Sequence, residues 1–497
     1  MKPPGLVTIA LSAALLAACG TTTPSTSRVA VDNAGTASGT SVSSGARSAS
    51  VPAGAGDGLA GSGAGGAAGG PTAGRGPVSS TEGGTSGTAS ASTELSPADH
   101  RPVQIGLLVG KDIAQMMSAM GYKGLSTGDG AAQARAAVGI LNKHGGLGGH
   151  PIEPVIFQFD ASQDANTQYQ AACAAFFSDA HVKAVISATM GAGIVPECAR
   201  QHAVPYVNAY TDSTDLATLH RMPGLVLSGA LTIEDDARLL VQGLVRQGWF
   251  RPASAGEVVR IGLLTHDAPA YKGVQRIVQA ELRSAGLALD DTSFQTFDSQ
   301  AQAPQDGQAA ALKFASKGVN RVITVDTHGF AMSWFGLAAA SQHYYPRLGM
   351  TTMELPATET AVLTPATLAG SLAIGWAQVA DTDVAHQRSL GSRYDACSKA
   401  MTAAGQDMTN ATVRQAGFAV CEAVNVLAAG WTAGDLTIAG LQQGLRAVGS
   451  AFDTTLTFGD DWSLSRAGIT GWRPASYSSG CNCYVYSAPP RTYRPSP

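Results

Sequence analysis

The chain has 497 residues, of which 44% are hydrophobic and only 14% are charged, and its 32 Lys and Arg against 36 Asp and Glu give a formal net charge of −4. A nucleic-acid-binding protein needs a basic surface that displaces counterions, so this balance, without any local run of Lys or Arg, excludes nucleic acid as a partner. The 59 glycines are many for a globular chain, which indicates that two kinds of sequence are averaged together.

Residues 1–19 (MKPPGLVTIALSAALLAAC) form a predicted export signal, with one Lys and an apolar run from Leu6 to Leu16. That run is too short for a permanent membrane-spanning helix. Its end, LAAC up to Cys19 with a glycine after it, resembles the lipobox of bacterial lipoproteins. The resemblance implies cleavage before Cys19 and a lipid on its thiol, which would hold the protein outside the cytoplasm on the bacterial cell membrane. The alternative is an ordinary signal peptide that happens to contain a Cys.

Residues 20–100 have the composition of a tether. From residue 21 to residue 100, 63 of 80 residues are Gly, Ser, Thr, Ala or Pro, and none is aromatic. Such a segment cannot bury enough apolar surface to offset its conformational entropy, so we expect it to be disordered. As a random coil it would reach about 50 Å.

Residues 101–497 are too many for one ordinary core and are expected to form two domains. Short apolar runs alternate there with segments of helical spacing, which predicts parallel sheets with right-handed crossovers. The first series is strand 103–109, helix 131–143, strand 152–159, helix 166–180, strand 182–187, helix 191–202 and strand 204–207. The second series is strand 258–265, helix 274–285, strand 321–325, helix 332–342 and strand 348–351. Two such units in tandem imply a cleft, with ligands at the carboxyl ends of the strands.

The order of several short motifs resembles the Leu/Ile/Val-type, or type I periplasmic, solute-binding proteins. The opening run IGL at 105–107 is followed by a helix that ends in an Asn and by the turn GGLGGHPI at 145–152, as in that family. Near the other end, FGDD at 458–461 with a later glycine is similar to the family's terminal hairpin. The match spans essentially all of residues 101–487.

The resemblance implies an α/β fold of two lobes, each a parallel sheet flanked by helices, joined by three hinge crossings near Ser228, Pro356 and Ala451. The strand Leu372–Val379 and the helix Arg414–Ala429 would belong to the first lobe. The implied parts are lobe 1 at 101–228 plus 357–451, lobe 2 at 229–356 plus 452–487, and a tail at 488–497.

Seven cysteines leave six if Cys19 carries a lipid, an even number that predicts disulfides in an exported protein. The resembled family often bridges the two helices that here carry Cys173 and Cys198. Cys397 and Cys421 also lie on neighbouring predicted helices and form the second predicted pair. Cys481 and Cys483 could close a small ring; metal binding is the alternative, although a Cys-x-Cys with no nearby His is a poor zinc site, and no metal or other cofactor is expected.

The resemblance also implies ligand-binding residues in the first lobe. The loop 187–193 follows a strand and precedes a helix, where free N–H groups and the helix dipole favour an anion. By resemblance it would hold a carboxylate through Thr189, Met190 and Gly191, with ordinary helix capping as the alternative. The next loop would bind an ammonium group through Ala209, Tyr210 and Thr211, unless Tyr210 packs under the lobe instead.

In the second lobe, Asp267 and Tyr271 match the loop whose aromatic side chain closes over the ligand, and His328 and Glu354 follow the next two strands. Glu354 would face the ammonium, with a solvated loop acid as the alternative. The first loop of the first lobe departs from the family, because Lys111 and Asp112 stand where Gly-Pro-x-Ser/Thr-Gly is usual. Either residue in the cleft would favour a polar or charged ligand.

Two other patterns carry less weight. The letters GLSTG at 124–128 match the hydrolase nucleophile elbow around Ser126, but no strand pattern precedes them. His144 and His150 bracket the glycine turn, and two histidines alone do not make a metal site.

The resemblance therefore implies a non-enzymatic, monomeric binding protein that captures an amino acid or related carboxylate and presents it to the permease of an ATP-driven importer. The alternative is a surface sensor or envelope-assembly factor that uses the same fold to bind a protein or wall fragment.

Overall fold

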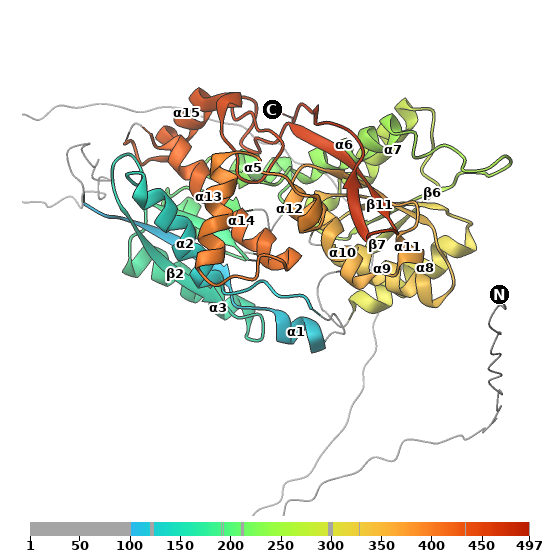
Figure 1. The fold of residues 1–497 in the computed structure, drawn as a ribbon, viewed down its shortest axis with the longest axis horizontal. Helices are drawn as coiled ribbons and strands as arrows, with labels where there is room; N and C mark the ends of the chain where they lie inside the picture. The colour runs from blue at the N-terminus through green and yellow to red at the C-terminus, as the bar shows by residue number, and fades with distance from the viewer. Residues whose placement is uncertain are drawn as a thin grey trace, which may run out of the picture. The chain divides into compact units, whose positions relative to one another are not determined.

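The first sheet of the computed structural model is built from the early apolar runs of the sequence. The structure describes residues 101–119, 124–189, 191, 193–209, 213–296, 302–327, 329–432 and 434–496, so the predicted signal, Cys19 and the predicted tether lie outside it. Five parallel strands pair in the order β2-β1-β3-β4-β5. The edge strand β2 lies near the helices labelled α2 and α3 in Figure 1. They are β1 (Val103–Gly110), β2 (Ile152–Phe159), β3 (Ala184–Ala188), β4 (Tyr206–Ala209) and β5 (Leu225–Ser228).

Helices cover both faces of this sheet, which explains why its strands are apolar without alternation. One face contacts α2 (Gly130–Lys143) and α14 (Ala411–Gly430), and the other contacts α3 (Ala165–Cys173) and α4 (Val195–Gln201). A glycine in β1 allows close packing, because a Cβ on Gly106 would lie 2.9 Å from the ring of Phe176. The other helices of this region are α1 (Ala114–Ala119), the π-helical turn Ala174–Asp179, α5 (Leu216–Arg221), α13 (Ser392–Ala403) and α15 (Ile438–Val448).

The second sheet has eight strands and begins with five parallel ones in the order β7-β6-β8-β9-β10. The C-terminal segment then adds β11 and β12 antiparallel to that edge, and β13 pairs with β11. The strands are β6 (Ile261–His266), β7 (Asp291–Gln295), β8 (Arg321–Val325), β9 (Arg347–Thr351), β10 (Leu372–Gly375), β11 (Gly471–Ser478), β12 (Cys483–Tyr486) and β13 (Arg491–Thr492).

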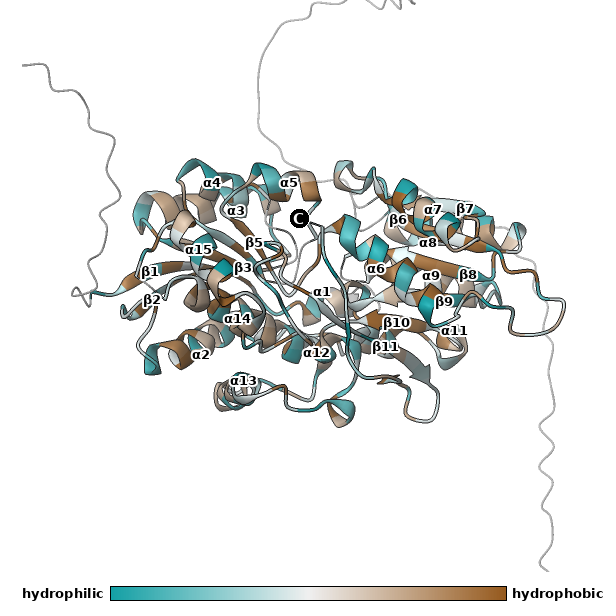
Figure 2. Cartoon of the chain, turned by 90° about the horizontal axis from the view of Figure 1, so that it is seen from above, coloured by the Kyte–Doolittle hydropathy of each residue, from teal (hydrophilic) through white to brown (hydrophobic). Residues whose placement is uncertain are grey.

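The second sheet is also covered on both faces. The helix α6 (Ile233–Arg246) contacts β8, β9, β10 and α7 (Val274–Ser284), while α8 (Ala303–Ser316), α9 (Phe330–Ser341) and α11 (Pro365–Leu368) lie on the other side. The short helices α10 (Pro356–Val362) and α12 (Gln378–Asp381) follow β9 and β10, and 3₁₀ turns span Pro269–Tyr271, Thr352–Glu354, Val384–His386 and Gly449–Ala451. Strands of both sheets carry hydrophobic residues (Figure 2).

One predicted assignment is wrong. The segment around Leu372 was expected in the first lobe, but β10 pairs with β9 and β11 and therefore belongs to the second sheet. The chain was expected to cross between the lobes near Pro356, but this crossing comes after β10, at Trp376. The Trp376 indole N–H donates to the carbonyl of Gly229, and the backbone carbonyl of Trp376 accepts from the N–H of Phe458 at 3.0 Å. Three separate chain segments therefore meet at this residue. The remaining lobe boundaries stay a prediction.

The cysteines meet in the three predicted pairs. The sulfur atoms of Cys173 and Cys198 lie 2.07 Å apart and those of Cys397 and Cys421 lie 2.05 Å apart, while Cys481 and Cys483 are also joined. The oxidation state of each pair in the protein stays a prediction. Among the residues described here, no helix has the length and apolarity needed to cross a membrane.

Candidate functional site

A pocket of about 110 Å³ opens at the carboxyl ends of the strands of the first sheet. Val109 and Gly110 close β1, Phe159 closes β2, and Thr189 follows β3. The first turns of α14 form the opposite wall, and the second lobe contributes the start of α9 and the start of α10. The lining side chains are mostly apolar and include Ile113, Met117, Leu125, Phe159, Phe330, Leu355, Ala416, Ala419 and Val420. We call this the apolar pocket.

Close backbone approach and buried hydrogen bonds shape the apolar pocket. A Cβ on Gly130 would lie 2.5 Å from the carbonyl oxygen of Gly110, so glycine lets α2 begin directly against β1. The amide of Gln133, on the next turn of α2, donates to the carbonyl of Thr127 at 2.8 Å and to the side chain of Gln406 at 3.1 Å. These contacts join α2, the loop before it and the region before α14 into one wall.

The charged residues of the first loop are held by the loop itself. The ammonium of Lys111 lies 2.9 Å from a carboxylate oxygen of Asp160, with its side chain half exposed. Asp112 accepts hydrogen bonds from the backbone of Ala114 and from the hydroxyl of Ser126, which donates at 2.9 Å. Lys111 therefore stands at the rim of the apolar pocket, and Asp112 organises the loop.

Four of the predicted ligand-binding residues, Met190, Tyr210, Thr211 and His328, lie outside the described residues. Thr189 lines the apolar pocket, and its hydroxyl donates to the carbonyl of Gly191 in its own loop. Ala209 is fully buried as the last residue of β4. The structure thus brings Thr189 to the pocket and gives its hydroxyl a contact within its own loop. This contact is not helix capping, because α4 has Ile194 at its N-cap and no side-chain cap hydrogen bond. The predicted carboxylate contact of Thr189 stays a prediction.

Asp267 and Tyr271 follow β6 in the second lobe. Asp267 is exposed, and its N–H donates to the carbonyl of Gln295 at 2.9 Å. Tyr271 is 8% exposed and packs edge-on against His266, with ring centroids 4.7 Å apart. Burial among carboxyl groups raises the pKa of the Tyr271 hydroxyl well above its usual value. Tyr271 is therefore part of the core of the second lobe, and its removal would test packing as well as binding.

Glu354 is fully buried rather than a solvated loop acid. One carboxyl oxygen accepts from the N–H of Asp326 at 2.9 Å, and the other accepts from the hydroxyl of Thr351 at 2.9 Å and from its N–H. These bonds form a capping box around the turn that follows β9. Both oxygens are thus occupied by the protein's own groups, and the predicted contact of Glu354 with an ammonium stays untested.

Glu354 belongs to an acid cluster at the carboxyl ends of β6, β8 and β9, which we define as Asp236, His266, Asp326 and Glu354. The His266 ring contacts the Asp326 carboxylate. Burial raises the pKa of Asp236 to about 7, and burial and the charge of Asp236 raise that of Glu354 well above its usual value. Burial therefore favours the protonated forms of Asp236 and Glu354 at mildly acidic pH.

The nucleophile-elbow pattern does not form an elbow. Among the described residues, no strand runs directly into Ser126, whose hydroxyl donates to Asp112 and accepts from the N–H of Gly128 at 3.1 Å. His144 and His150 each contact a backbone carbonyl through Nδ1.

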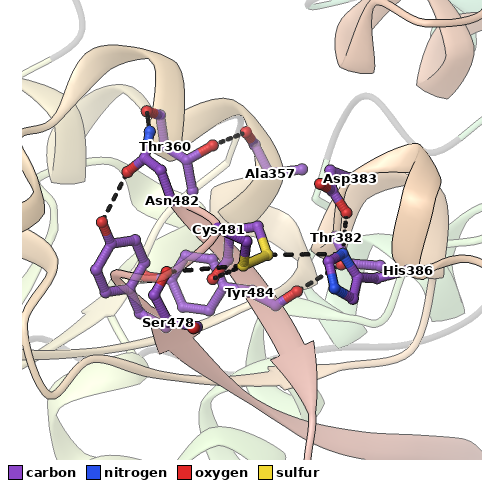
Figure 3. Close-up of a disulfide and its surroundings, with 11 residues drawn as sticks. Ala357, Thr360, Thr382, Asp383, His386, Ser478, Cys481, Asn482 and Tyr484 are labelled. Atoms are coloured by element: carbon purple, nitrogen blue, oxygen red, sulfur yellow. Dashed lines mark hydrogen bonds and ion pairs between the residues drawn. A yellow bond between two sulfur atoms is a disulfide. The ribbon is translucent and has the colours of Figure 1, made fainter.

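A different histidine approaches the Cys481–Cys483 pair (Figure 3). His386 offers a ring nitrogen within 4.8 Å of both sulfur atoms, a neighbour that the sequence spacing could not show. Because the two sulfurs are joined to each other, they offer no thiolate to a metal ion in this state.

Sequence reasoning missed much of the wall of the apolar pocket. Leu125, Phe159, Ala416 and Val420 read as ordinary core residues, and no motif distinguishes them. The sequence did contain one signal for this wall: the segment that forms α14 is long and apolar, and it was predicted as a helix of the first lobe.

Comparisons with known proteins agree on the fold. No family model matches the chain, and no curated protein matches it. Solved structures do: a substrate-binding protein of an ABC transporter from Desulfitobacterium hafniense in complex with Leu is 18% identical, covers 78% of this chain and 99% of its own, and has a TM-score of 0.52. A branched-chain amino acid ABC transporter protein from Thermus thermophilus with bound valine is 15% identical, with 79% and 97% covered and a TM-score of 0.56.

A possible leucine/isoleucine/valine-binding protein from Rhodopirellula baltica is 15% identical, with 79% and 98% covered and a TM-score of 0.53. At these identities the likeness concerns the fold. The parallel strands of the first sheet, the mostly parallel second sheet, their flanking helices and the crossing at Trp376 agree with it. The chain therefore has the two-lobed α/β fold of the type I periplasmic binding proteins.

Proposed function

We propose that this protein is an extracytoplasmic solute-binding protein that captures a small ligand in the apolar pocket and presents it to the permease of an ABC importer. The observation that carries the proposal is the position of the pocket: it opens at the carboxyl ends of the first sheet and is completed by Phe330, Leu355 and Thr358 of the second lobe. A ligand that touches both lobes favours their closed arrangement, because only differential affinity shifts such an equilibrium.

The lining of the pocket supports a ligand with an apolar body and an anionic group. The walls of Leu125, Phe159 and Val420 are apolar, whereas the Lys111 ammonium stands at the rim and the loop of Thr189 follows β3. An amino acid with an apolar side chain, or a related carboxylate, fits this distribution.

A thermal-shift screen of the protein against amino acids, small carboxylates, peptides and sugars tests the proposal. A ligand that binds only the folded state stabilises it by RT ln(1 + [L]/Kd), about 2.7 kcal/mol at a hundredfold excess over Kd. We expect apolar amino acids or carboxylates to raise the Tm and sugars to leave it unchanged. A Tm that no compound of the set alters would contradict the proposal.

A matched pair of variants locates the ligand. Ala416→Trp fills the apolar pocket from α14 and should reduce affinity at least tenfold. Ala428→Trp introduces the same side chain about three turns further along α14, at another partly buried position outside the pocket, and should keep the affinity of the unaltered protein. Equal affinities of the two variants would place the ligand elsewhere.

Attachment to the membrane is a separate part of the proposal. Cys19→Ala removes the thiol that would carry the lipid, so we expect the variant to appear in the soluble fraction of bacterial cells while the unaltered protein sediments with membranes. Ser25→Ala, six residues further along in the predicted tether, serves as the control. Membrane retention of the Cys19→Ala protein would refute the lipid anchor.

A further inference from the structure

The Cys481–Cys483 bond lies in the turn between β11 and β12 (Figure 3). Cys481 is exposed, whereas Cys483 is 2% exposed on β12, opposite Ser478 of β11. The residue between them is held from two sides, because the Asn482 amide donates to the carbonyl of Thr360 at 3.1 Å and its oxygen accepts from the Tyr477 hydroxyl at 2.7 Å. One sulfur of the pair is thus open to solvent on an anchored turn.

Holding the fold together does not explain this bond. The two other pairs join residues 25 and 24 positions apart and tie neighbouring helices, whereas Cys481 and Cys483 are two positions apart. The stabilisation from a cross-link grows with the length of chain that it closes, so the shortest loop contributes least. The hairpin is already held by the pairing of β11 with β12. The bond can therefore open at little cost to the fold.

The surroundings of the two sulfurs differ. Cys483 Sγ lies 3.6 Å from Nδ1 of His386, whose turn is fixed by a contact between the same ring nitrogen and the Asp383 carboxylate. Cys481 Sγ instead lies 3.7 Å from the carbonyl oxygen of Ser478. The one hydrogen that Nδ1 can carry is shared between the Asp383 carboxylate and Cys483 Sγ. Even a shared N–H stabilises a thiolate, whereas a carbonyl oxygen does not. Reduction should therefore leave the negative charge on Cys483.

We propose that Cys481 and Cys483 form a thiol–disulfide exchange site for a dithiol partner. A thiolate of the partner attacks the exposed Cys481 Sγ, a mixed disulfide forms, and the electron pair of the broken bond goes to Cys483 Sγ beside His386. The partner's second thiolate then attacks the partner sulfur of the mixed disulfide and releases Cys481 as a thiolate. The partner leaves as a disulfide, and two electrons have moved to the cysteine pair. The two new thiolates can take up from water the two protons that the partner thiols released on ionising.

Titration of the full chain with reduced and oxidised dithiothreitol, followed by alkylation and peptide mass spectrometry, tests the proposal. We expect Cys481 and Cys483 to become alkylated under conditions that leave Cys173, Cys198, Cys397 and Cys421 oxidised. His386→Ala should slow the reduction of the pair about tenfold, and His386→Gln, which retains a donor, should restore part of the rate. His144→Ala, at an exposed histidine of the first lobe, should have no effect.

Two single-cysteine variants make the test independent of His386. Here an aromatic disulfide probe replaces oxidised dithiothreitol. Cys483→Ser should rapidly form a mixed disulfide with the probe at the exposed Cys481. Cys481→Ser should react at least tenfold more slowly, because Cys483 is buried. Simultaneous reduction of all three pairs, or equal reactivity of the two single-cysteine variants, would overturn the proposal.

Discussion

The side chains at the carboxyl ends of the strands differ between the two sheets. At the carboxyl ends of the first sheet the structure has apolar side chains, a hydroxyl that satisfies its own loop and one rim lysine. At the carboxyl ends of the second sheet it has the acid cluster. There the backbone N–H of Asp326 donates to the buried carboxyl group of Glu354, and that of Ala331 donates to the buried carboxyl group of Asp326. One edge is open for a ligand, whereas the other is occupied by contacts of the protein with itself.

This difference shows why a residue's place in a fold does not settle its role. Thr189 and Glu354 both follow parallel strands and were both predicted to bind a ligand. Only Thr189 lines the apolar pocket, because both oxygens of Glu354 complete the hydrogen bonds of a buried turn. The second lobe instead reaches the pocket through Leu355, the residue after Glu354, which adopts a positive φ of 54°.

The largest expected effect comes from removing Glu354. Glu354→Ala leaves the N–H groups of Asp326 and Thr351 buried without their acceptor, so we expect the free energy of unfolding to fall by about 2–4 kcal/mol. Thr189→Ala loses one hydroxyl contact and should cost about 1 kcal/mol. Urea unfolding measures both.

Glu354→Gln is the matched control, because it keeps the shape of the side chain and one acceptor oxygen. Its loss of stability should lie between those of the two alanine variants. If Glu354→Ala were no less stable than Thr189→Ala, the contrast between the two sheet edges would be wrong.

The pH dependence of stability is the next effect. Burial raises the pKa of Asp236 and Asp381 to about 7 and of Glu359 to about 8, whereas in the unfolded chain such acids ionise near pH 4. Between about pH 4 and pH 7 the unfolded state therefore binds fewer protons, and the free energy of unfolding should fall as the pH rises. Each acid contributes at most roughly 1.4 kcal/mol per pH unit.

Asp236→Asn removes one of these acids from the acid cluster without changing its shape. Urea unfolding at several pH values should show a shallower decline for this variant than for the unaltered protein. Asp160→Asn, which alters an acid of the first lobe whose pKa is lowered by Ser162 and Lys111, should leave the decline between pH 4 and pH 7 in place. A profile unchanged by Asp236→Asn would contradict the raised pKa of Asp236.

The smallest effect on stability is expected at the rim of the apolar pocket. Lys111→Met breaks an exposed ion pair with Asp160 and should change the free energy of unfolding by less than about 1 kcal/mol. If a carboxylate ligand is identified, its affinity should fall more than the stability does. Equal affinity of the variant and the unaltered protein for that ligand would remove Lys111 from the site.

The sequence predicted many strands and helices of the two sheets, because most buried strands are continuous apolar runs and their helices have apolar stripes. It missed β5, β7, α6 and α8; the residues of β7, DTSFQ, form no apolar run. The predicted strand at 321–325 has the bounds of β8, and the helix predicted over 332–342 is α9 at Phe330–Ser341. The prediction failed at β10, whose residues LAIG are equally apolar in either lobe. Local pattern does not say which sheet a strand will join, because pairing depends on distant partners.

By itself the sequence determined the alternation of strand and helix, and with it the covering of the parallel strands by helices on both faces, since these depend on the spacing of apolar residues along the chain. It also placed Thr189 at the end of a strand. Only the tertiary structure decided that β10 pairs with β9, that α14 closes the apolar pocket, that Glu354 caps a buried turn and that His386 stands beside Cys483. These outcomes depend on contacts between residues far apart in the chain, which follow from how the whole core packs and not from any local pattern.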